Sequence, residues 1–200
     1  MSEAESLWIV QAQNGDDLAF ANLVEAYQRP VYNLCYRMLG DAYQAEDAAQ
    51  ESFLRAYKAI RRYDNSRPFA TWLLSIASHY CIDQIRKRRM QIVSFESIPG
   101  GGEVIPDNAL TPEAKVRINE DHQQIQELLN VLSPVDRSAV IMYYWYDYTY
   151  EEIAEALSLT MSAVKSRLHR ARRQLAETMQ DKHHSHPLPV ERKRHESPAF

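Results

Sequence analysis

Glycine, cysteine and long apolar runs are scarce in this 200-residue chain, and each scarcity excludes a class of protein. The five glycines form no loop of the kind that cradles phosphate groups. No stretch approaches the roughly 20 consecutive apolar residues that a membrane-spanning helix needs. The two cysteines, Cys35 and Cys81, lie in separate apolar helical patterns, which favours reduced core thiols over a disulfide or a redox pair.

Signals for secretion and for catalysis are also lacking. The acidic start Met1–Ser6 is unlike a secretory signal, so we expect a cytoplasmic protein. No nucleophile with a neighbouring base and no closed metal site is recognisable. Glu151 and Glu152 are adjacent carboxylates, but neighbours on a helix point apart and cannot act as an acid–base pair. The apolar fraction of 45% suffices for folded cores. We therefore expect a folded protein that is not an enzyme and needs no cofactor.

The net charge of −4 hides an uneven distribution of charge along the chain. Residues 1–90 hold 11 acids and 11 bases, and residues 131–180 hold six of each. Residues 91–130 hold seven acids and two bases and so carry −5, while three acids and four bases in the last 20 residues restore −4. Local cationic stripes within the two neutral parts can bind a phosphate backbone even though the net charge is negative.

Apolar residues recur at helical spacing through most of the chain, and no strand-like alternation persists. The pattern predicts helices over residues 17–39, 42–57, 71–89, 122–132 and 134–146. Pro30 predicts a kink or two abutting helices within the first of these. Gly40 and Asp41 predict a helix end followed by a new N-cap, and Ser133 before Pro134 is typical of a helix start. The fold class is therefore all-α.

Two stretches lack these patterns. Proline and glycine at 99–102 and Pro106 interrupt regular structure in the acidic segment, which predicts a flexible linker. The last 20 residues contain three prolines and four histidines and predict a disordered tail. His183, His184 and His186 are possible metal ligands there, but the tail interpretation is favoured.

The most specific motif lies between Thr149 and Arg173. Thr149 and Glu152 form a capping box at the start of a short helix. A second helix follows after Ser158–Thr160, with one apolar stripe formed by Val164, Leu168, Ala171 and Leu175. Residues 161–173 carry five bases and no acid, which argues against a helix that is basic only for solubility. The motif predicts a helix-turn-helix whose second helix enters the major groove, with base edges near its start and phosphates further along.

A second cationic stretch, Arg86–Arg89, ends the helix that follows the polar loop Asp64–Arg67. Cations also offset the dipole at a helix C-terminus, so the cluster alone does not indicate nucleic acid. A polar loop able to hold unpaired bases, beside cations able to hold phosphates, predicts contact with a single strand.

An acidic face is predicted on the helix over residues 42–57, where Glu46, Asp47, Gln50 and Glu51 share one side. A solvated surface is the usual explanation for such a face. Carboxylates repel DNA, however, and these adjoin the segment 53–55 in a module that faces DNA. A protein partner is therefore the favoured interpretation.

Taken in order, these motifs resemble those of bacterial sigma factors of the sigma-70 family. The segment Asp41–Tyr57 resembles the polymerase-binding part of region 2, and Phe69–Ala77 with Ile82–Arg89 resembles its promoter −10 part. Residues 132–141 and Thr149–Arg173 resemble region 4, the −35 reader. A chain with regions 2 and 4 alone is similar to the extracytoplasmic-function (ECF) group, and the resemblance runs from about residue 18 to 176.

The resemblance implies two small helical domains joined by a flexible acidic linker. The implied boundaries are a region 2 bundle at 1–90, the linker at 91–121, a region 4 helix-turn-helix at 122–180, and a tail at 181–200. It also implies that Trp72 occupies a core position rather than acting as a wedge that melts DNA, and that the linker runs near the path of nascent RNA.

The resemblance further implies three functional surfaces. The face that would dock on the β′ clamp helices of core RNA polymerase comprises Asp47, Gln50, Glu51, Phe53 and Arg55. The −10 surface, with a loop for a flipped non-template base and cations for the strand, comprises Asp64, Asn65, Ser66, Arg67, Arg86, Lys87, Arg88 and Arg89. The −35 surface comprises Ser162, Ala163, Lys165, Ser166, Arg167, Arg170 and Arg173.

The implied partners are core RNA polymerase, through the β′ clamp helices and the β flap, promoter DNA and an anti-sigma factor. An anti-sigma factor could hold the protein at the inner face of the membrane until a stress response requires it. No small-molecule substrate is implied.

Two other functions remain open on the sequence alone. A stand-alone transcriptional regulator would use the same helix-turn-helix on duplex DNA without polymerase, and residues 1–90 would then sense a signal or dimerise. An RNA-binding or anti-termination factor would use the Arg86–Arg89 cluster on single strands and would keep that activity without residues 122–200. Neither function needs the acidic face.

Overall fold

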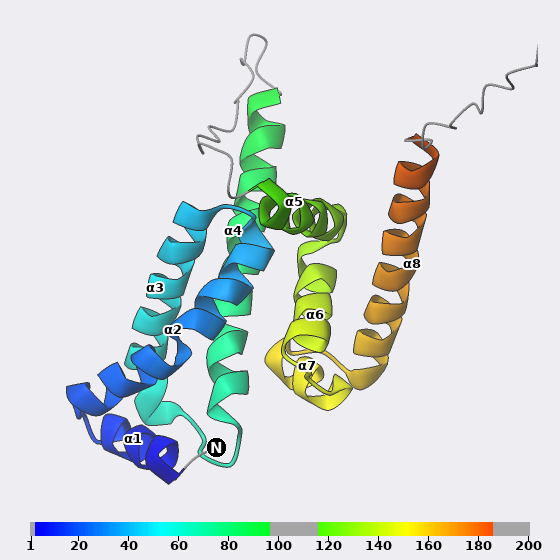
Figure 1. Ribbon diagram of the computed structural model, residues 1–200. Coiled ribbons are helices and arrows are strands. Elements are labelled where there is room, and N and C mark those ends of the chain that lie inside the picture. Colours follow the sequence, from blue (N-terminus) through cyan, green and yellow to red (C-terminus); the bar gives the residue numbers. More distant parts are fainter. Residues whose placement is uncertain (1–2, 97–115, 186–200) are drawn as a thin grey trace, which may run out of the picture.

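The computed structural model describes residues 3–96 and 116–185, and within these ranges it contains helices and no strand (Figure 1). The all-α prediction is confirmed. The first range holds α1 (Glu3–Gln13), α2 (Asp17–Leu39), α3 (Ala42–Ala59), a 3₁₀ turn (Ile60–Arg62) and α4 (Phe69–Glu96). The second holds α5 (Val116–Val131), α6 (Pro134–Trp145), α7 (Tyr150–Ala156) and α8 (Met161–Ser185).

Local capping signals set several of the helix starts, as the sequence predicted. Asp41 Oδ1 accepts a hydrogen bond from the backbone N–H of Gln44 (2.8 Å) at the start of α3. Gly40 closes α2 in the left-handed conformation (φ +76°), which glycine adopts without steric cost. Ser133 caps α6, and the Thr149–Glu152 capping box starts α7. α2 continues as a single helix through Pro30, so the alternative of two abutting helices was wrong.

The first four helices form a bundle in which α2 packs against α1, α3 and α4 (Figure 1). α1 was not predicted, yet Ile9 and Ala12 are 2% and 4% exposed in the core. Aromatic rings close the end of the bundle near the 3₁₀ turn. The Trp72 ring lies 4.8 Å from Tyr63 and 5.5 Å from Phe69, centroid to centroid. Trp72 is thus half-buried in an aromatic cluster, as expected for a packing residue.

The helices α6, α7 and α8 form the helix-turn-helix module, with α5 packed against α8. Its centre is apolar and fully buried, with contributions from Leu132, Ile141, Ile153, Val164 and Leu168. The predicted stripe on the second helix therefore faces inward and leaves the cationic side chains of α8 outside.

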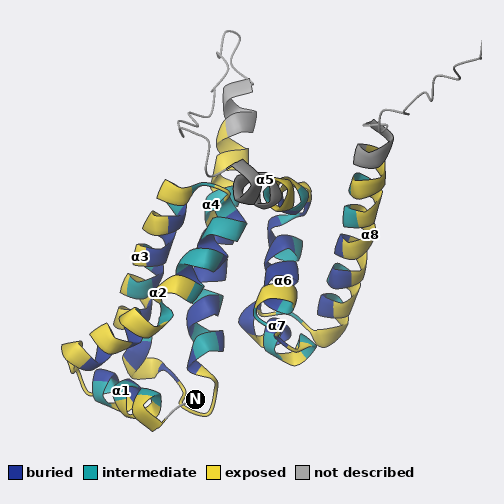
Figure 2. Cartoon of the chain, viewed as in Figure 1, coloured by how far each residue is buried: buried dark blue, intermediate teal, exposed yellow. Residues whose placement is uncertain are grey.

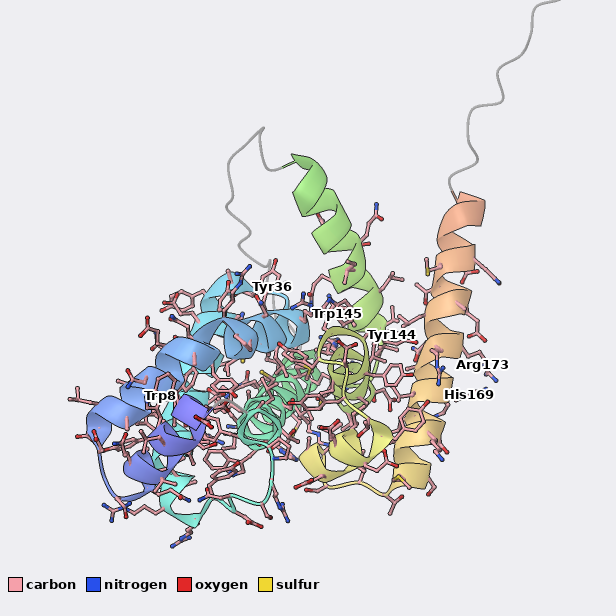
Figure 3. All side chains as sticks on the ribbon, turned by 60° about the horizontal axis from the view of Figure 1, so that its bottom comes forward. Trp8, Tyr36, Tyr144, Trp145, His169 and Arg173 are labelled. Carbon is pink, nitrogen blue, oxygen red and sulfur yellow. The ribbon has the colours of Figure 1, made fainter. Side chains whose placement is uncertain are left out.

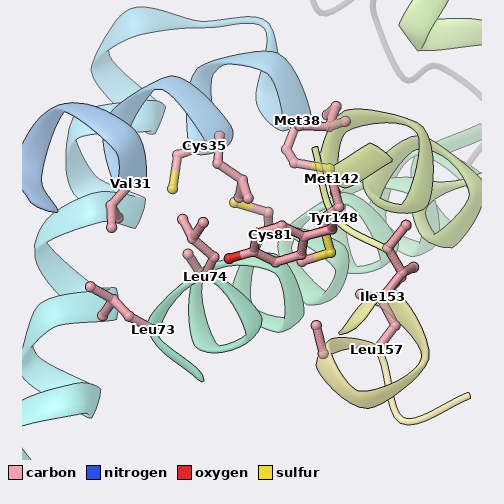
Figure 4. Close-up of a cluster of buried hydrophobic side chains, with 14 of the residues drawn as sticks. Val31, Cys35, Met38, Leu73, Leu74, Cys81, Met142, Tyr148, Ile153 and Leu157 are labelled. Carbon is pink, nitrogen blue, oxygen red and sulfur yellow. The ribbon is translucent and has the colours of Figure 1, made fainter. Parts of the chain in front are cut away.

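The two modules are packed together and share one hydrophobic core (Figures 2 and 4). Met38 of α2 and Cys81 of α4 lie in the same cluster as Met142 of α6, with Tyr148 and Ile153 beside them (Figure 4). We call this contact of α2 and α4 with α6 and α7 the seam. Both cysteines are free and buried, in agreement with the expectation of core thiols.

Helical structure extends beyond the proposed domain limits. α4 continues to Glu96, α5 already begins at Val116, and α8 runs to Ser185. The central part of the proposed linker and most of the proposed tail, including His186, lie outside the described residues. Across the described residues, each helix is too short or too polar to span a bilayer.

Candidate nucleic-acid and partner interfaces

An open groove runs between α2 and α3. One hollow of about 490 Å³ is lined by Val24, Gln28, Arg29, Tyr32, Glu46, Ala49, Gln50 and Phe53. A neighbouring hollow of about 460 Å³ shares three of these residues and adds Phe20, Leu54 and Tyr57. We call the two together the α2–α3 groove. Its floor is apolar and its rim is polar, which is the anatomy of a protein-binding surface.

The predicted acidic face divides into two parts in the structure. Gln50 and Phe53 line the α2–α3 groove, and Asp47 is exposed on the same helix. Glu51 instead accepts a hydrogen bond from Arg55 (Nε to Oε1, 2.8 Å). The Arg55 guanidinium lies 4.7 Å from the centroid of the Tyr80 ring on α4. Glu51 and Arg55 are therefore engaged with each other and with α4.

Several groove residues were missed by the sequence reasoning. Phe20 and Val24 on α2 and Tyr57 on α3 line the groove, and none of the three was among the predicted contact residues. The Tyr57 hydroxyl donates to Asp17 Oδ1 (2.6 Å), and this bond raises the pKa of the Tyr57 phenol. A half-exposed aromatic ring, held by a hydrogen bond at the rim, is a signal that only the tertiary structure reveals.

The loop Asp64–Arg67 is a closed turn held by its own hydrogen bonds. Asp64 accepts from the backbone N–H of Ser66 (3.0 Å), which lowers the pKa of the Asp64 carboxyl. The Arg67 N–H donates to the Asp64 carbonyl (3.1 Å). The Arg67 guanidinium pairs with Glu155 of α7 (2.9 Å) and lies 3.7 Å from Asp64. The turn thus touches the second module through one ion pair.

Gln13 of α1 anchors the same loop and was not predicted. Its side-chain amide donates to the carbonyl of Tyr63 (2.8 Å) and to that of Ile60 (3.2 Å). Its oxygen accepts from the Asn65 side chain (3.0 Å). No local sequence signal marks Gln13, because its partners lie about 50 positions further along the chain.

The cluster Arg86–Arg89 is exposed along α4, on the stretch that follows the buried Ile82. The helix does not end at Arg89 but continues to Glu96, about two turns further, so the expectation that the cluster ends a helix was wrong. A dipole-capping explanation is correspondingly weakened, because that effect fades beyond the last turn. The four exposed cations remain, and because neighbours on a helix point apart, they are spread around α4 rather than lined up on one side. Those that share a side can contact a phosphate backbone.

The second helix of the helix-turn-helix presents most, but not all, of its predicted contacts. Ser162, Lys165, Ser166 and Arg170 are exposed, and Ala163 is half-buried. His169 and Arg173 project from the outer side of α8, where Arg173 also pairs with Glu177 (3.1 Å) (Figure 3). Arg167 points the other way: it pairs with Asp136 of α6 (2.8 Å) and is 28% exposed. In this structure Arg167 braces the module rather than facing outward.

The seam contains polar groups that the sequence did not single out. Arg137 of α6 is 5% exposed and donates to the Met38 carbonyl at the end of α2 (2.6 Å). Burial, and then repulsion from Arg89, lowers the pKa of Arg137 to about 10. The Tyr146 hydroxyl donates to the Pro30 carbonyl (2.6 Å). Burying a cation at the junction of two modules costs desolvation energy, and the hydrogen bond from Arg137 to the Met38 carbonyl offsets part of that cost while joining α6 to α2.

Trp145 and Gln126 extend the seam on its outer side. The Arg37 guanidinium lies 5.0 Å from the centroid of the Trp145 ring, which Figure 3 shows beside Tyr36 at the junction. The Gln126 amide donates to the Arg37 carbonyl (3.1 Å). Three helices of the second module, α5, α6 and α7, thus contact α2 or α4.

Known protein families match both modules. Residues 23–90 match the family model of sigma-70 region 2, and residues 122–175 match that of sigma-70 region 4. The ECF RNA polymerase sigma factor SigW of Bacillus subtilis is 36% identical over 179 residues, covering 86% of this chain and 95% of that protein. The ECF sigma factor SigE of Mycolicibacterium smegmatis is 31% identical, covering 80% of this chain and 63% of that protein.

Solved structures share the fold. The structure of CnrH in complex with the cytosolic domain of CnrY has a TM-score of 0.67 and 21% identity, over 90% of this chain and 99% of that one. The sigma factor RpoE of Bartonella quintana, in complex with the anti-sigma factor NepR, has a TM-score of 0.64 and 22% identity, over 80% of this chain and 96% of that one.

Proposed function

This chain belongs to the ECF group of the sigma-70 family, and we propose that it carries out the group's function with the surfaces described above. It is a transcription initiation factor and not an enzyme. In our proposal the α2–α3 groove docks core RNA polymerase on its β′ clamp helices. The loop Asp64–Arg67 and the Arg86–Arg89 cluster contact the −10 element, and the exposed side of α8 reads the −35 element.

The observation that carries the proposal is the α2–α3 groove. Exposed apolar area that is contiguous and rimmed by polar groups marks a protein-binding site. Here Leu54 and Tyr57 are 54% and 46% exposed beside the floor formed by Phe53. Neither a stand-alone regulator nor an RNA-binding factor requires such a groove. A sigma factor requires it for polymerase.

The DNA surfaces support the same function through charge. α8 carries exposed cations beyond its first turn, where they can reach phosphates, and small polar side chains at its start, where they can reach base edges. The −35 contacts in this proposal are Ser162, Ala163, Lys165, Ser166, Arg170 and Arg173. Arg167 joins them only if its ion pair with Asp136 opens on DNA. The domain limits 1–90, 91–121, 122–180 and 181–200 remain part of the proposal.

Control by an anti-sigma factor is proposed as well. The two structures of like fold contain a second protein, which in one of them is named as an anti-sigma factor. We propose that the chain acts in the cytoplasm, where it meets polymerase, and that an anti-sigma factor withholds it, at the inner membrane face if that factor is membrane-bound.

The test is binding to core RNA polymerase. The variant Asp47→Ala/Gln50→Ala removes one carboxylate and one amide from the exposed side of α3. Its control, Glu3→Ala/Asn14→Ala, removes the same two groups from exposed positions at the start of α1 and directly after its end. We expect nanomolar-range binding by the wild type, a loss of roughly a hundredfold in the first variant, and little change in the control.

Circular dichroism of both variants verifies the fold. Equal binding by both variants would remove the groove as the docking face. A folded wild type that binds promoter duplex but not polymerase would leave the stand-alone regulator as the function.

A further inference from the structure

On the side of α1, the loop Asp64–Arg67 is held by the side chain of Gln13. The loop's own bonds close its turn, and two hydrogen bonds from Gln13 to the carbonyls of Tyr63 and Ile60 tie the segment that leads into it to α1. The third bond, from Asn65 to Gln13, fixes the direction of an exposed side chain at the centre of the loop. All three hydrogen-bonding groups of the Gln13 amide are thus used on this one segment.

The helix that carries Gln13 is a firm support. Ile9 and Ala12 bury α1 in the core of the bundle, and the Tyr27 hydroxyl donates to Glu5 (2.6 Å) from α2. α1 also packs directly on the 3₁₀ turn that precedes the loop. Because α1 lies before residue 23, where the match to the region 2 family model begins, no role in promoter reading follows from that match.

A hollow of about 130 Å³ lies between α1 and the loop. It is lined by Ser6, Ile9, Val10, Tyr63 and Asn65. Its lining is mostly apolar and aromatic, and Asn65 is one of the two polar residues that contribute to it. An apolar and aromatic wall with a fixed amide is the combination that reads a single unstacked base, because the ring packs on the wall and the amide tests the base edge.

We propose that Gln13 is a positioning residue for −10 recognition, and that α1 is thereby part of the promoter-reading site. Gln13 contacts no DNA in this proposal; it sets the direction of Asn65 and the height of the loop above the hollow. A reading group must be held in place by its neighbours to discriminate between bases, since a loose group adapts to any of them. The inference rests on the proposed function of the loop as the −10 reader.

The test uses the variant Gln13→Glu in full-length protein reconstituted with core polymerase. The substitution keeps the size of the side chain and the acceptor for Asn65, but replaces the two donated bonds with a carboxylate oxygen facing the carbonyls of Tyr63 and Ile60. The control is Asn14→Asp, which adds the same charge one residue further along at an exposed position whose amide bonds only within α1, to the Val10 carbonyl. Gln13→Ala serves as the uncharged second variant.

The measurement is in vitro transcription from a promoter library randomised at the −10 and −35 elements, with polymerase affinity and thermal unfolding recorded for each variant. We expect Gln13→Glu and Gln13→Ala to lower the preference at one −10 position about tenfold, the discrimination of one good base contact. The −35 preference, polymerase affinity and the control's profile should stay as in the wild type.

Two results would overturn the inference. One is an unchanged −10 profile in folded Gln13 variants. The other is an equal loss of activity on every −10 sequence, which would mean that Gln13 supports the bundle without tuning the reader. A wild-type holoenzyme with no −10 preference at all is a separate outcome, because it contradicts the proposed function before Gln13 is tested.

Discussion

The helix α2 has apolar residues on two sides, one of which is open to solvent while the other is covered by the second module. Toward α3 it forms the open α2–α3 groove, where Phe20 and Val24 line hollows that reach the surface. Toward α6 it forms the seam, where Cys35 and Met38 are completely covered. The same helix therefore contributes one surface that is left for a partner and one that is already occupied by the chain's own second module.

The difference lies in what accompanies the apolar side chains. The seam buries a cation, Arg137, and the hydroxyl of Tyr146, each paired with a backbone carbonyl of α2. Interfaces between domains that separate during function are more polar than permanent cores, and a buried ion pays back little net stability. The buried polar groups of the seam are typical of a contact between domains that can separate. The groove, by contrast, is an exposed apolar surface of the kind that binds another protein.

The largest effect is expected from an apolar truncation in the seam. Met142→Ala removes a side chain that is fully buried beside Met38 and Tyr148 (Figure 4), and should lower the free energy of unfolding by about 2–5 kcal/mol. Leu54→Ala in the groove, where the side chain is 54% exposed, should change it by about 0.5 kcal/mol or less. Urea unfolding followed by circular dichroism compares the two. Equal losses would contradict the distinction between a closed side and an open side.

A smaller effect is expected from the buried cation. Arg137→Ala removes the charged hydrogen bond to the Met38 carbonyl and should cost about 1.5–3 kcal/mol. Arg137→Met keeps most of the apolar volume without the charge, and should recover part of that loss because no cation has to be desolvated. The same urea measurement applies. If both variants are as stable as the wild type, the hydrogen bond of Arg137 does not stabilise the seam.

The local parts of this structure could be predicted from the sequence, and the long-range parts could not. Asp41, Ser133 and Thr149 cap helices through partners three residues away, so their signals are contained in a few letters. α1 was missed because its apolar residues run consecutively over residues 7–10 rather than at helical spacing.

The seam and the loop anchor were missed for a different reason. Tyr146 bonds a carbonyl 116 positions away and Arg137 one 99 positions away, and neither distance leaves a trace in a local pattern. Gln13 reads as an ordinary polar residue until the fold brings it to Tyr63 and Asn65. The direction of Arg167 is a similar case, since a cation in a row of cations gives no hint that Asp136 turns it inward.

The smallest effect concerns the ion pair between Arg67, in the loop Asp64–Arg67, and Glu155 of the second module. Arg67 and Glu155 are both more than a third exposed, so Glu155→Gln should lower the free energy of unfolding by about 1 kcal/mol or less. Salt screens such pairs, and the difference between the variant and the wild type should shrink between low and high ionic strength. The control is Glu151→Gln, the same change at an exposed position of the same helix.

The ion pair between Arg67 and Glu155 also tests whether the seam and the α2–α3 groove affect each other's binding functions. While Glu155 holds Arg67, that guanidinium is less available to a phosphate, so Glu155→Gln should strengthen binding of a single-stranded −10 oligonucleotide by severalfold at low salt. Binding to core polymerase through the α2–α3 groove should be unaffected, because the groove lies across α2 from the seam. An equal gain in Glu151→Gln would show that the added affinity comes from the lost negative charge in general. A gain confined to Glu155→Gln would mean that the closed arrangement restrains the −10 loop while leaving the polymerase face open.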